Sequence, residues 1–185
     1  MSKKFRLLMF ALIFSIPTLA LAGQPAGFWH TPGVPGFGHV HVWKGVHTVF
    51  LPNKHTVYKA LFDITKSKHM DKLNGSLDHA ARTVNAFAIM GVPLKNLKFA
   101  LVVHGPATSV VLSAKAFKAK FGYANPNLKV IDALAKAGVV LTVCGNALAD
   151  NGYKPSEVNP KIKIALSAIS TIVILQNKGY ALMRF

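Results

Sequence analysis

The nine residues "LKFALVVHG" (97–105) indicate the class of fold. Apolar side chains follow one another through the middle of this stretch, without the alternation that a half-exposed strand shows. A continuous apolar run of this length is typical of a strand that is buried on both faces, as in a parallel sheet covered by helices. We therefore expect an α/β domain built around this strand.

The segments on either side alternate between strand and helix patterns. We expect strands at 56–64, 97–105, 139–144, 161–167 and 180–185, and helices at 76–91, 127–138 and 168–179, with a helical or broken helical crossover at 106–122. The β-branched residues of 168–179 leave a strand possible there. Strands that alternate with helices predict βαβ units, a small parallel sheet and right-handed connections, with helices on both faces.

Three regions divide the chain. Residues 1–22 begin with basic side chains, continue with an apolar run and end in Ala20-Leu21-Ala22, which is the pattern of a secretion signal. The run is short for a membrane anchor, so we expect cleavage after Ala22, a periplasmic protein and no stable membrane insertion; a retained anchor is the alternative. Residues 23–54 form a Gly-, Pro- and His-rich extension, expected to pair as a hairpin around Lys44-Gly45, and residues 55–185 form the α/β domain.

The charge of the chain limits its partners. Its 22 basic and 6 acidic residues give a formal net charge of +16, which favours anionic small molecules, anionic membrane surfaces or an acidic protein. Nucleic acid would be the first expectation for an intracellular protein. Export argues against it, and after residue 22 only Arg82 and Arg184 are arginines, so we expect no nucleic acid. A basic surface that serves solubility alone is the other reading.

Three reactive side chains follow the ends of predicted strands. Asp63 ends the first strand, His104 and Gly105 end the second, and Cys144 ends the third. Ligands of parallel α/β sheets bind beyond the carboxyl ends of the strands. A carboxylate, an imidazole and a thiol are therefore expected at one edge of the sheet.

Cys144 is the only cysteine, so an intramolecular disulfide is impossible. It precedes a helix-like segment, where unpaired backbone N–H groups favour the thiolate. Gly145 would leave room for a partner's sulfur, and the backbone after Cys144, at Gly145 and Asn146, would stabilise the charge. His104 would pair with the thiolate or carry a proton, and Asp63 would orient the imidazole or cap a turn. The alternative is that Cys144 packs as a small apolar residue.

The histidines of the extension form a second candidate site. Five of the eight lie between residues 30 and 55, and His39 and His41 would share one face of a strand. They are weak candidates for copper or zinc, because two histidines do not complete a tetrahedral site. We therefore expect no metal or other cofactor.

Several fragments, in this order, resemble the DsrE/DsrF-like family over residues 55–185. They are "YKALFDI" (58–64), Asn85, "VVHG" (102–105), "NP" (125–126), "AGVVLTVCGNAL" (137–148) and "LQNKGYALMRF" (175–185). The resemblance implies a five-stranded parallel α/β fold, assembly into oligomers and, for some members, sulfur relay through a cysteine persulfide. It also implies that Cys144 is the family's cysteine, that His104 and Gly105 are its strand end, and that Asn85 is a helix position that is often polar.

Together these observations predict a periplasmic DsrE-like protein that binds or transfers sulfane sulfur on Cys144. Its expected partners are a sulfur donor, a sulfur acceptor and further copies of itself. Whether it is an enzyme stays open at this point. The alternative is a non-catalytic binding or assembly protein of the cell envelope, which would act through the sheet edge or hold a metal in its His-rich extension.

Overall fold

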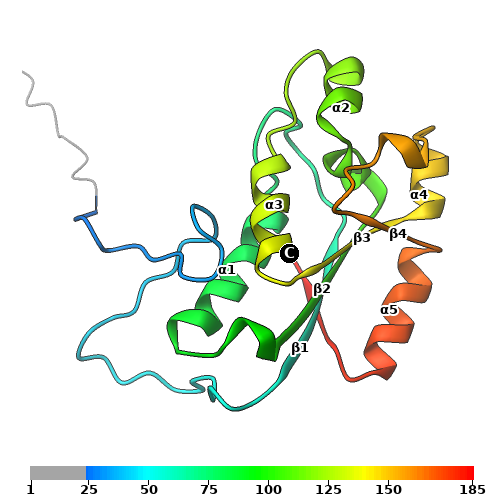
Figure 1. The fold of residues 1–185 in the computed structure, drawn as a ribbon. Coiled ribbons are helices and arrows are strands. Elements are labelled where there is room, and N and C mark those ends of the chain that lie inside the picture. Colours follow the sequence, from blue (N-terminus) through cyan, green and yellow to red (C-terminus); the bar gives the residue numbers. More distant parts are fainter. Residues whose placement is uncertain (1–23) are drawn as a thin grey trace, which may run out of the picture.

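The computed structural model describes residues 24–185, so the predicted signal at 1–22 lies outside the described residues. Its centre is a five-stranded sheet, all parallel, in the order β4-β3-β2-β1-β5 (Figure 1). The strands are β1 (Tyr58–Ile64), β2 (Leu97–Val103), β3 (Val140–Cys144), β4 (Lys163–Ala165) and β5 (Ala181–Arg184). The predicted α/β class and parallel sheet are confirmed.

Five α-helices and three short 3-10 helices connect these strands in the described part of the chain. The α-helices are α1 (Gly75–Ile89), α2 (Ala114–Phe121), α3 (Leu128–Lys136), α4 (Gly145–Asp150) and α5 (Ala168–Asn177). The 3-10 helices are η1 (Leu94–Asn96), η2 (Gly105–Val111) and η3 (Pro155–Glu157). None of the helices in residues 24–185 has the length and apolar character needed to span a bilayer.

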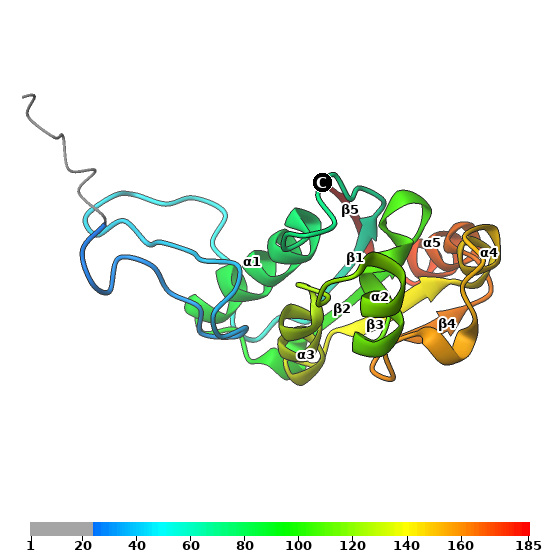
Figure 2. The same ribbon diagram turned by 90° about the horizontal axis from the view of Figure 1, so that it is seen from above.

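The direction of the chain explains why helices cover both faces. From β1 to β4 each new strand is added on the same side of the previous one, and α1, α2 and α3 lie on one face, which we call the first face (Figures 1 and 2). After β4 the chain returns across the sheet to pair β5 with β1. Because parallel connections are right-handed, this reversal places α5 on the opposite, second face.

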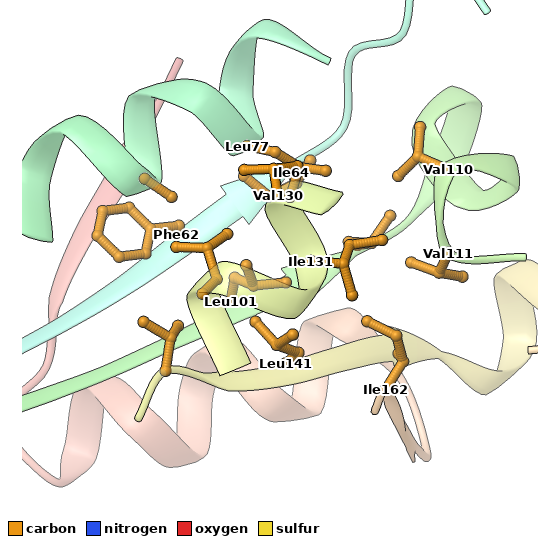
Figure 3. Close-up of a cluster of buried hydrophobic side chains, with 14 of the residues drawn as sticks. Phe62, Ile64, Leu77, Leu101, Val110, Val111, Val130, Ile131, Leu141 and Ile162 are labelled. Carbon is orange, nitrogen blue, oxygen red and sulfur yellow. The ribbon is translucent and has the colours of Figure 1, made fainter. Parts of the chain in front are cut away.

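The main core lies on the first face. Phe62 and Leu101 point from β1 and β2 toward Leu77 of α1 and Ile131 of α3, and all four side chains are buried (Figure 3). Side chains of β3 and of the loops around η2 extend the same cluster. Two aromatic contacts, Phe62 with Phe99 and Phe99 with Phe87, join the strands to α1.

The core of the second face is smaller. It contains six buried residues, which are Leu61, Ala100, Val102, Cys144, Ala147 and Ala168. α5 lies over them, and its outer side is exposed to solvent. Ile169 is 77% exposed, and Leu166, which lies just before the helix, is 81% exposed. Val173 and Ile174, further along the same helix, are also exposed.

The crossover between β2 and β3 is broken rather than continuous. η2 and α2 are separated at Leu112 and Ser113, and the Ser113 hydroxyl caps α2 by accepting from the Ala116 N–H at 3.3 Å. α3 begins at Leu128 with Asn127 as its N-cap residue, one position after the start of the helix expected at 127–138. The Asn125 side chain donates to the carbonyls of Val110 in η2 and of Leu112 and accepts from the Asn127 N–H, which ties the two segments together.

Residues 24–57, which we call the arm, run along the outer side of α1. The buried amide of Asn85 on α1 holds the arm: its Oδ1 accepts from the N–H groups of Gly33 and Val34, each at 2.8 Å, and its Nδ2 donates to the carbonyls of Phe37 and Gly38. Gly38 is required here, because it has φ +59° and a Cβ would lie 2.0 Å from the backbone N of Arg82.

The arm does not form the hairpin that the sequence suggests. A turn occurs at Lys44 and Gly45, but the residues on either side of it do not pair as strands. The backbone pairing within the arm is an isolated antiparallel bridge between His30 and Val40. Contact with α1, rather than strand pairing, therefore sets the course of the arm.

Candidate functional site

Four chemically active side chains lie at the carboxyl end of the sheet and on its second face. Side chains alternate between the two faces of a strand. Asp63 and His104 follow Leu61 and Val102 by two positions, and both of these residues belong to the second-face core, as does Cys144 itself. Arg184 is the register partner of Asp63 on β5. The fold therefore gathers all four residues on one face, from four different strands or their ends.

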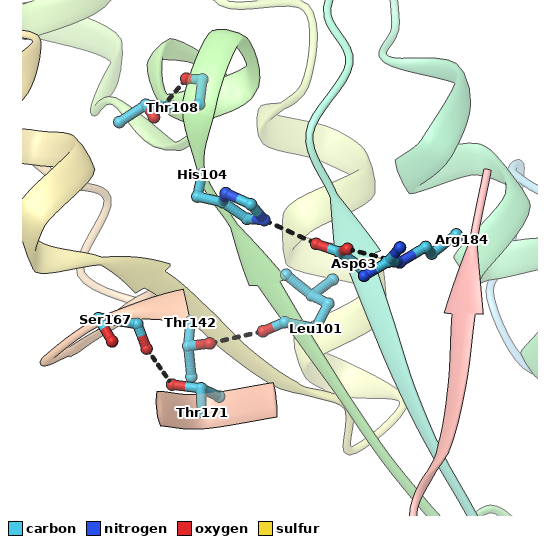
Figure 4. A network of polar contacts seen from close by, with 9 residues as sticks. Asp63, Leu101, His104, Thr108, Thr142, Ser167, Thr171 and Arg184 are labelled. Carbon is cyan, nitrogen blue, oxygen red and sulfur yellow. Dashed lines mark hydrogen bonds and ion pairs between the residues drawn. The ribbon is translucent and has the colours of Figure 1, made fainter. Parts of the chain in front are cut away.

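Asp63 is the centre of a charged cluster. Its side chain is only 7% exposed, and each of its two carboxylate oxygens has one polar side-chain partner (Figure 4). His104 Nε2 donates to Oδ1 at 2.7 Å, and Arg184 Nε donates to Oδ2 at 3.1 Å. Charge-assisted hydrogen bonds of this kind offset the desolvation of a buried carboxylate.

This geometry fixes the tautomer of His104. An ionised carboxylate can only accept hydrogen bonds, so the Nε2 that contacts Asp63 carries a proton. Nδ1 is then the ring nitrogen whose lone pair is left to accept a hydrogen bond or a proton. The backbone N–H of His104 also donates to the Ile64 carbonyl at 3.0 Å, which keeps the ring at the edge between β1 and β2.

A cavity of about 420 Å³ opens over this cluster. Its lining is largely charged and consists of Asp63, Thr65, Lys66, His104, Arg184 and Phe185. Arg184 is 71% exposed, so one face of its guanidinium is available to a ligand. The lining contains two basic side chains, Lys66 and Arg184, and one carboxylate, so the cavity suits a small anion.

Cys144 lies at the end of β3, which neighbours β2, but its sulfur belongs to a different environment. The residue is 6% exposed and packs in the second-face core. Its Sγ accepts from the Ala147 N–H at 3.3 Å and so caps α4. The cavity lining does not include Cys144, and the His104 ring is turned toward Asp63 (Figure 4). The structure therefore brings Asp63 and His104 together and places the thiol beside them, buried and without a hydrogen bond to the imidazole.

The three residues proposed to surround the thiol and the strand end have distinct surroundings. A Cβ on Gly145 would lie 3.0 Å from the Ala165 carbonyl oxygen, so the space that this glycine leaves is taken up by the chain after β4. Asn146 is exposed on α4. Gly105 has φ +56° and begins η2 directly after His104, so the turn that ends β2 needs a glycine at this position.

The remaining candidates lie in or against the arm, away from the sheet edge. Asn85 is fully buried and holds the arm by four hydrogen bonds, so its amide faces the arm backbone. His41 stacks on Phe28 and its Nδ1 donates to the Phe28 carbonyl at 2.6 Å, while His39 is exposed and packs edge-on to Trp29. Residues 24–185 contain no group of three or more His, Cys, Asp or Glu side chains placed to hold a metal ion.

Sequence reasoning missed Arg184 and Lys66. The signal for Arg184 was present, because it is at the carboxyl end of the strand expected at 180–185, where the same edge rule selected Asp63 and His104. Lys66 lies in the loop after β1, two residues beyond the end of the strand, and lines the cavity. No sequence pattern marks this position.

Comparisons with known proteins bear on the domain as a whole. The model of the DsrE/DsrF-like family matches residues 59–185, which is more than half of the chain. A solved structure of a protein of unknown function, MTH1491 from Methanobacterium thermoautotrophicum, is 17% identical, with a TM-score of 0.47, and the match covers 69% of this chain and 99% of that one. No curated protein matches. The family match confirms the resemblance found in the sequence, and the chain belongs to the DsrE/DsrF-like family.

Proposed function

We propose that this protein takes part in sulfur relay and that Cys144 carries sulfane sulfur as a persulfide. Membership of the DsrE/DsrF-like family supports a role of this kind. The observation that carries the proposal is the position of the single thiol. Cys144 lies at the carboxyl end of β3, on the same face of the sheet as the Asp63–His104–Arg184 cluster.

The surroundings of the sulfur suit an anion. The Ala147 N–H already points at Sγ, and an N–H donor stabilises a thiolate more than a thiol. His104 follows β2, the strand next to that of Cys144, and its Nδ1 is free to take up a proton because its Nε2 is held by Asp63. We assign His104 the role of proton acceptor and Asp63 that of a positioning residue that orients the imidazole.

The proposed chemistry is balanced without an external oxidant. The Cys144 thiolate attacks the outer sulfur of a donor such as thiosulfate, an S–S bond to Cys144 forms, and the S–S bond within thiosulfate breaks. Sulfite leaves with the electron pair, and Cys144 becomes a persulfide. An acceptor thiolate then attacks the outer sulfur of that persulfide and restores the Cys144 thiolate.

The charged cavity supports an anionic donor. Lys66, His104 and Arg184 lie around one carboxylate, which favours thiosulfate or a polysulfide over a neutral thiol. Cys144 is buried, so a small donor reaches it more readily than a folded protein does. Transfer to a protein acceptor requires the chain around Ala165 to move away from Gly145.

The test is intact-protein mass spectrometry of the reduced chain after brief exposure to thiosulfate or polysulfide. We expect the wild type to gain the mass of one or more sulfur atoms and Cys144→Ser to gain none. His104→Ala and Asp63→Asn should both slow the uptake, by at least about tenfold for the histidine.

Loss of labelling in Cys144→Ser is trivial on its own, because that variant has no thiol. The matched control is Ala149→Cys in the Cys144→Ser background, which places one exposed thiol on the same helix, α4. Uptake by native Cys144 that is no faster than uptake by this exposed thiol would contradict a carrier role.

The burial of Cys144 favours the second candidate, a non-catalytic binding or assembly protein of the envelope. In that case the thiol fills the second-face core beside Leu61 and Val102. Alkylation of the native protein separates the two: a thiol that reacts with iodoacetamide only after denaturation supports the packing role.

We also propose that the protein assembles with copies of itself through α5. Ile169, Val173 and Ile174 are exposed on this helix, next to the exposed Leu166 and Ile164. Contiguous apolar surface of this kind is typical of a subunit interface. We expect Ile169→Ser with Val173→Ser to reduce the mass measured by light scattering to that of a monomer, and an unchanged mass would exclude α5 as the interface.

Export is the last part of the proposal. Residues 1–22 have the pattern of a cleaved signal, and we propose that the protein acts in the periplasm. Cell fractionation with N-terminal sequencing tests this. A first residue at Gly23 in the periplasmic fraction supports cleavage and export, and an intact N-terminus in the membrane fraction supports a retained anchor.

A further inference from the structure

A second and larger cavity lies between the arm and α1, away from the carboxyl edge of the sheet. Its volume is about 1160 Å³. The arm forms a wide loop that extends beyond α1 (Figures 1 and 2). The cavity is open to solvent and is lined by residues of this loop, by Arg82, Ala86 and Ile89 of α1 and by Met90 directly after it, and we call this space the arm cavity.

The lining of the arm cavity is apolar and aromatic. Trp29 is 50% exposed and Trp43 is 64% exposed, and Phe50 is completely exposed, so these large side chains are not used in a core. Phe50 has φ +52°, and among residues 24–185 it is the one non-glycine residue with a positive φ. A bulky residue held in this unfavourable conformation and turned to solvent is consistent with a binding role.

The lining of the arm cavity contains a basic side chain and no carboxylate. The sequence contains no Asp or Glu between residues 24 and 62, while the cavity lining includes Arg82, His39 and His47. Asp78 is one turn before Arg82 on α1, but it accepts from the Gly38 N–H at 2.8 Å and so holds the arm. Within the described residues, no carboxylate forms an ion pair with Arg82.

From these observations we infer that the arm cavity binds an amphipathic anion, a small molecule with a hydrocarbon or aromatic body and one acidic head group. The indole rings and the apolar side chains of the arm would contact the body, and the Arg82 guanidinium would pair with the head group. Binding pockets for such molecules are concave and apolar, with few polar groups, and have volumes of roughly 300–1000 Å³. The arm cavity, at about 1160 Å³, is slightly larger than this range.

This inference is independent of the sulfur chemistry proposed above, because the arm cavity shares no lining residue with the cavity over Asp63. The competing occupant is a second copy of the chain. α5, which carries the other exposed apolar surface, contains no tryptophan and no basic residue, whereas the arm cavity is concave and has Arg82 in its lining. These features favour a small anion over a protein surface.

The chain offers a direct reporter. It contains only two tryptophans, Trp29 and Trp43, and both line the arm cavity, so intrinsic tryptophan fluorescence reports on this site alone. We would titrate the full chain with dodecanoate below its micelle-forming concentration. Dodecan-1-ol and dodecyltrimethylammonium serve as neutral and cationic probes with the same tail. We expect a saturable change for dodecanoate, binding about threefold to fivefold weaker for the alcohol, and the weakest binding for the cation.

Three variants sharpen the test. Arg82→Gln should weaken the binding of dodecanoate by about threefold to fivefold and leave the binding of dodecan-1-ol unchanged. Lys115→Gln, which removes the same charge from an exposed position on α2 outside the cavity, should change neither. Ala86→Phe, at an exposed position of α1 in the cavity lining, should narrow the cavity and weaken the binding of both probes.

Three results would overturn the inference. They are an equal or non-saturating response to all three probes, an affinity for dodecanoate that Arg82→Gln and Lys115→Gln lower equally, and a fluorescence change that depends on protein concentration rather than on the probe. The last of these would assign the arm cavity to self-association instead.

Discussion

On the first face of the sheet, α1, α2 and α3 cover a core in which Phe62 and Leu101 are fully buried. On the second face, α5 crosses the sheet above a core of small and medium-sized residues. Asp63, His104 and Cys144 all lie on this second face, where fewer side chains are committed to packing. The larger core therefore lies on one face of the sheet, and Asp63, His104 and Cys144 lie on the other.

The two helices that cover these faces differ in the same way. α1 is covered on both sides, by the sheet and by the arm that Asn85 binds. α5 contacts the sheet on one side only, and Ile169 and Val173 remain exposed on the other. On the first face, α1 therefore carries an outer layer formed by the arm, whereas within residues 24–185 the outer side of α5 is exposed to solvent.

The largest expected effect tests the difference in packing. Leu101→Ala, on the first face, should lower the free energy of unfolding by about 3 kcal/mol, because it empties a fully buried site. Leu182→Ala makes the same change on β5, where the side chain is half-buried against the second face, and should cost about 1 kcal/mol. Urea unfolding of both variants measures this. Equal losses would show that the two faces contribute alike.

The next effect concerns the outer layer of α1. Asn85→Ala removes four hydrogen bonds to the arm and leaves buried backbone groups without partners, so we expect a loss of about 1–3 kcal/mol in the free energy of unfolding. Limited proteolysis should cleave the arm faster in this variant. Asn177→Ala, at an exposed asparagine of α5, is the control and should change neither property. Unchanged arm protection in Asn85→Ala would mean that other contacts hold the arm.

The smallest expected effect is a pH dependence of the free energy of unfolding, which arises from Tyr153 in the core of the first face. Burial raises the pKa of the Tyr153 phenol above its ordinary value of 10.0. The unfolded chain therefore releases this proton at lower pH than the folded chain. The resulting contribution to stability is complete below pH 10 and is lost as the pH rises through the folded pKa. Tyr153→Phe should make stability fall less steeply above pH 10, while Tyr123→Phe, at an exposed tyrosine, should leave the slope unchanged. Parallel slopes for all three proteins would contradict the prediction.

Much of the α/β domain could be predicted because its elements carry local patterns. The run at 97–105 became β2, and the helical spacing at 76–91 became α1, each within two residues of its expected ends. The ambiguous stretch at 168–179 became α5, although its β-branched residues also allowed a strand. This stretch forms the crossover that connects β4 to β5, and crossovers between parallel strands are usually helices.

The geometry of the site was harder to predict than the identity of the residues that form it. The edge rule found Asp63, His104 and Cys144, but it could not show that the imidazole is turned toward Asp63 while the thiol is buried. The role of Asn85 was also hidden. Its four partners lie in the arm, about fifty residues earlier in the chain, and no local pattern marks a contact over that distance.

The pairing of β5 with β1 has a consequence for the order of folding. β1 lies inside the finished sheet, but the strand that covers its second edge is synthesised only after every other element has appeared. Until then β1 presents an open edge of unpaired N–H and C=O groups, and the carboxylate of Asp63 lacks its Arg184 partner. A nascent chain of this protein is therefore exposed to edge-to-edge aggregation late in synthesis, and a chaperone that shields the edge of β1 would act at the step where protection matters most.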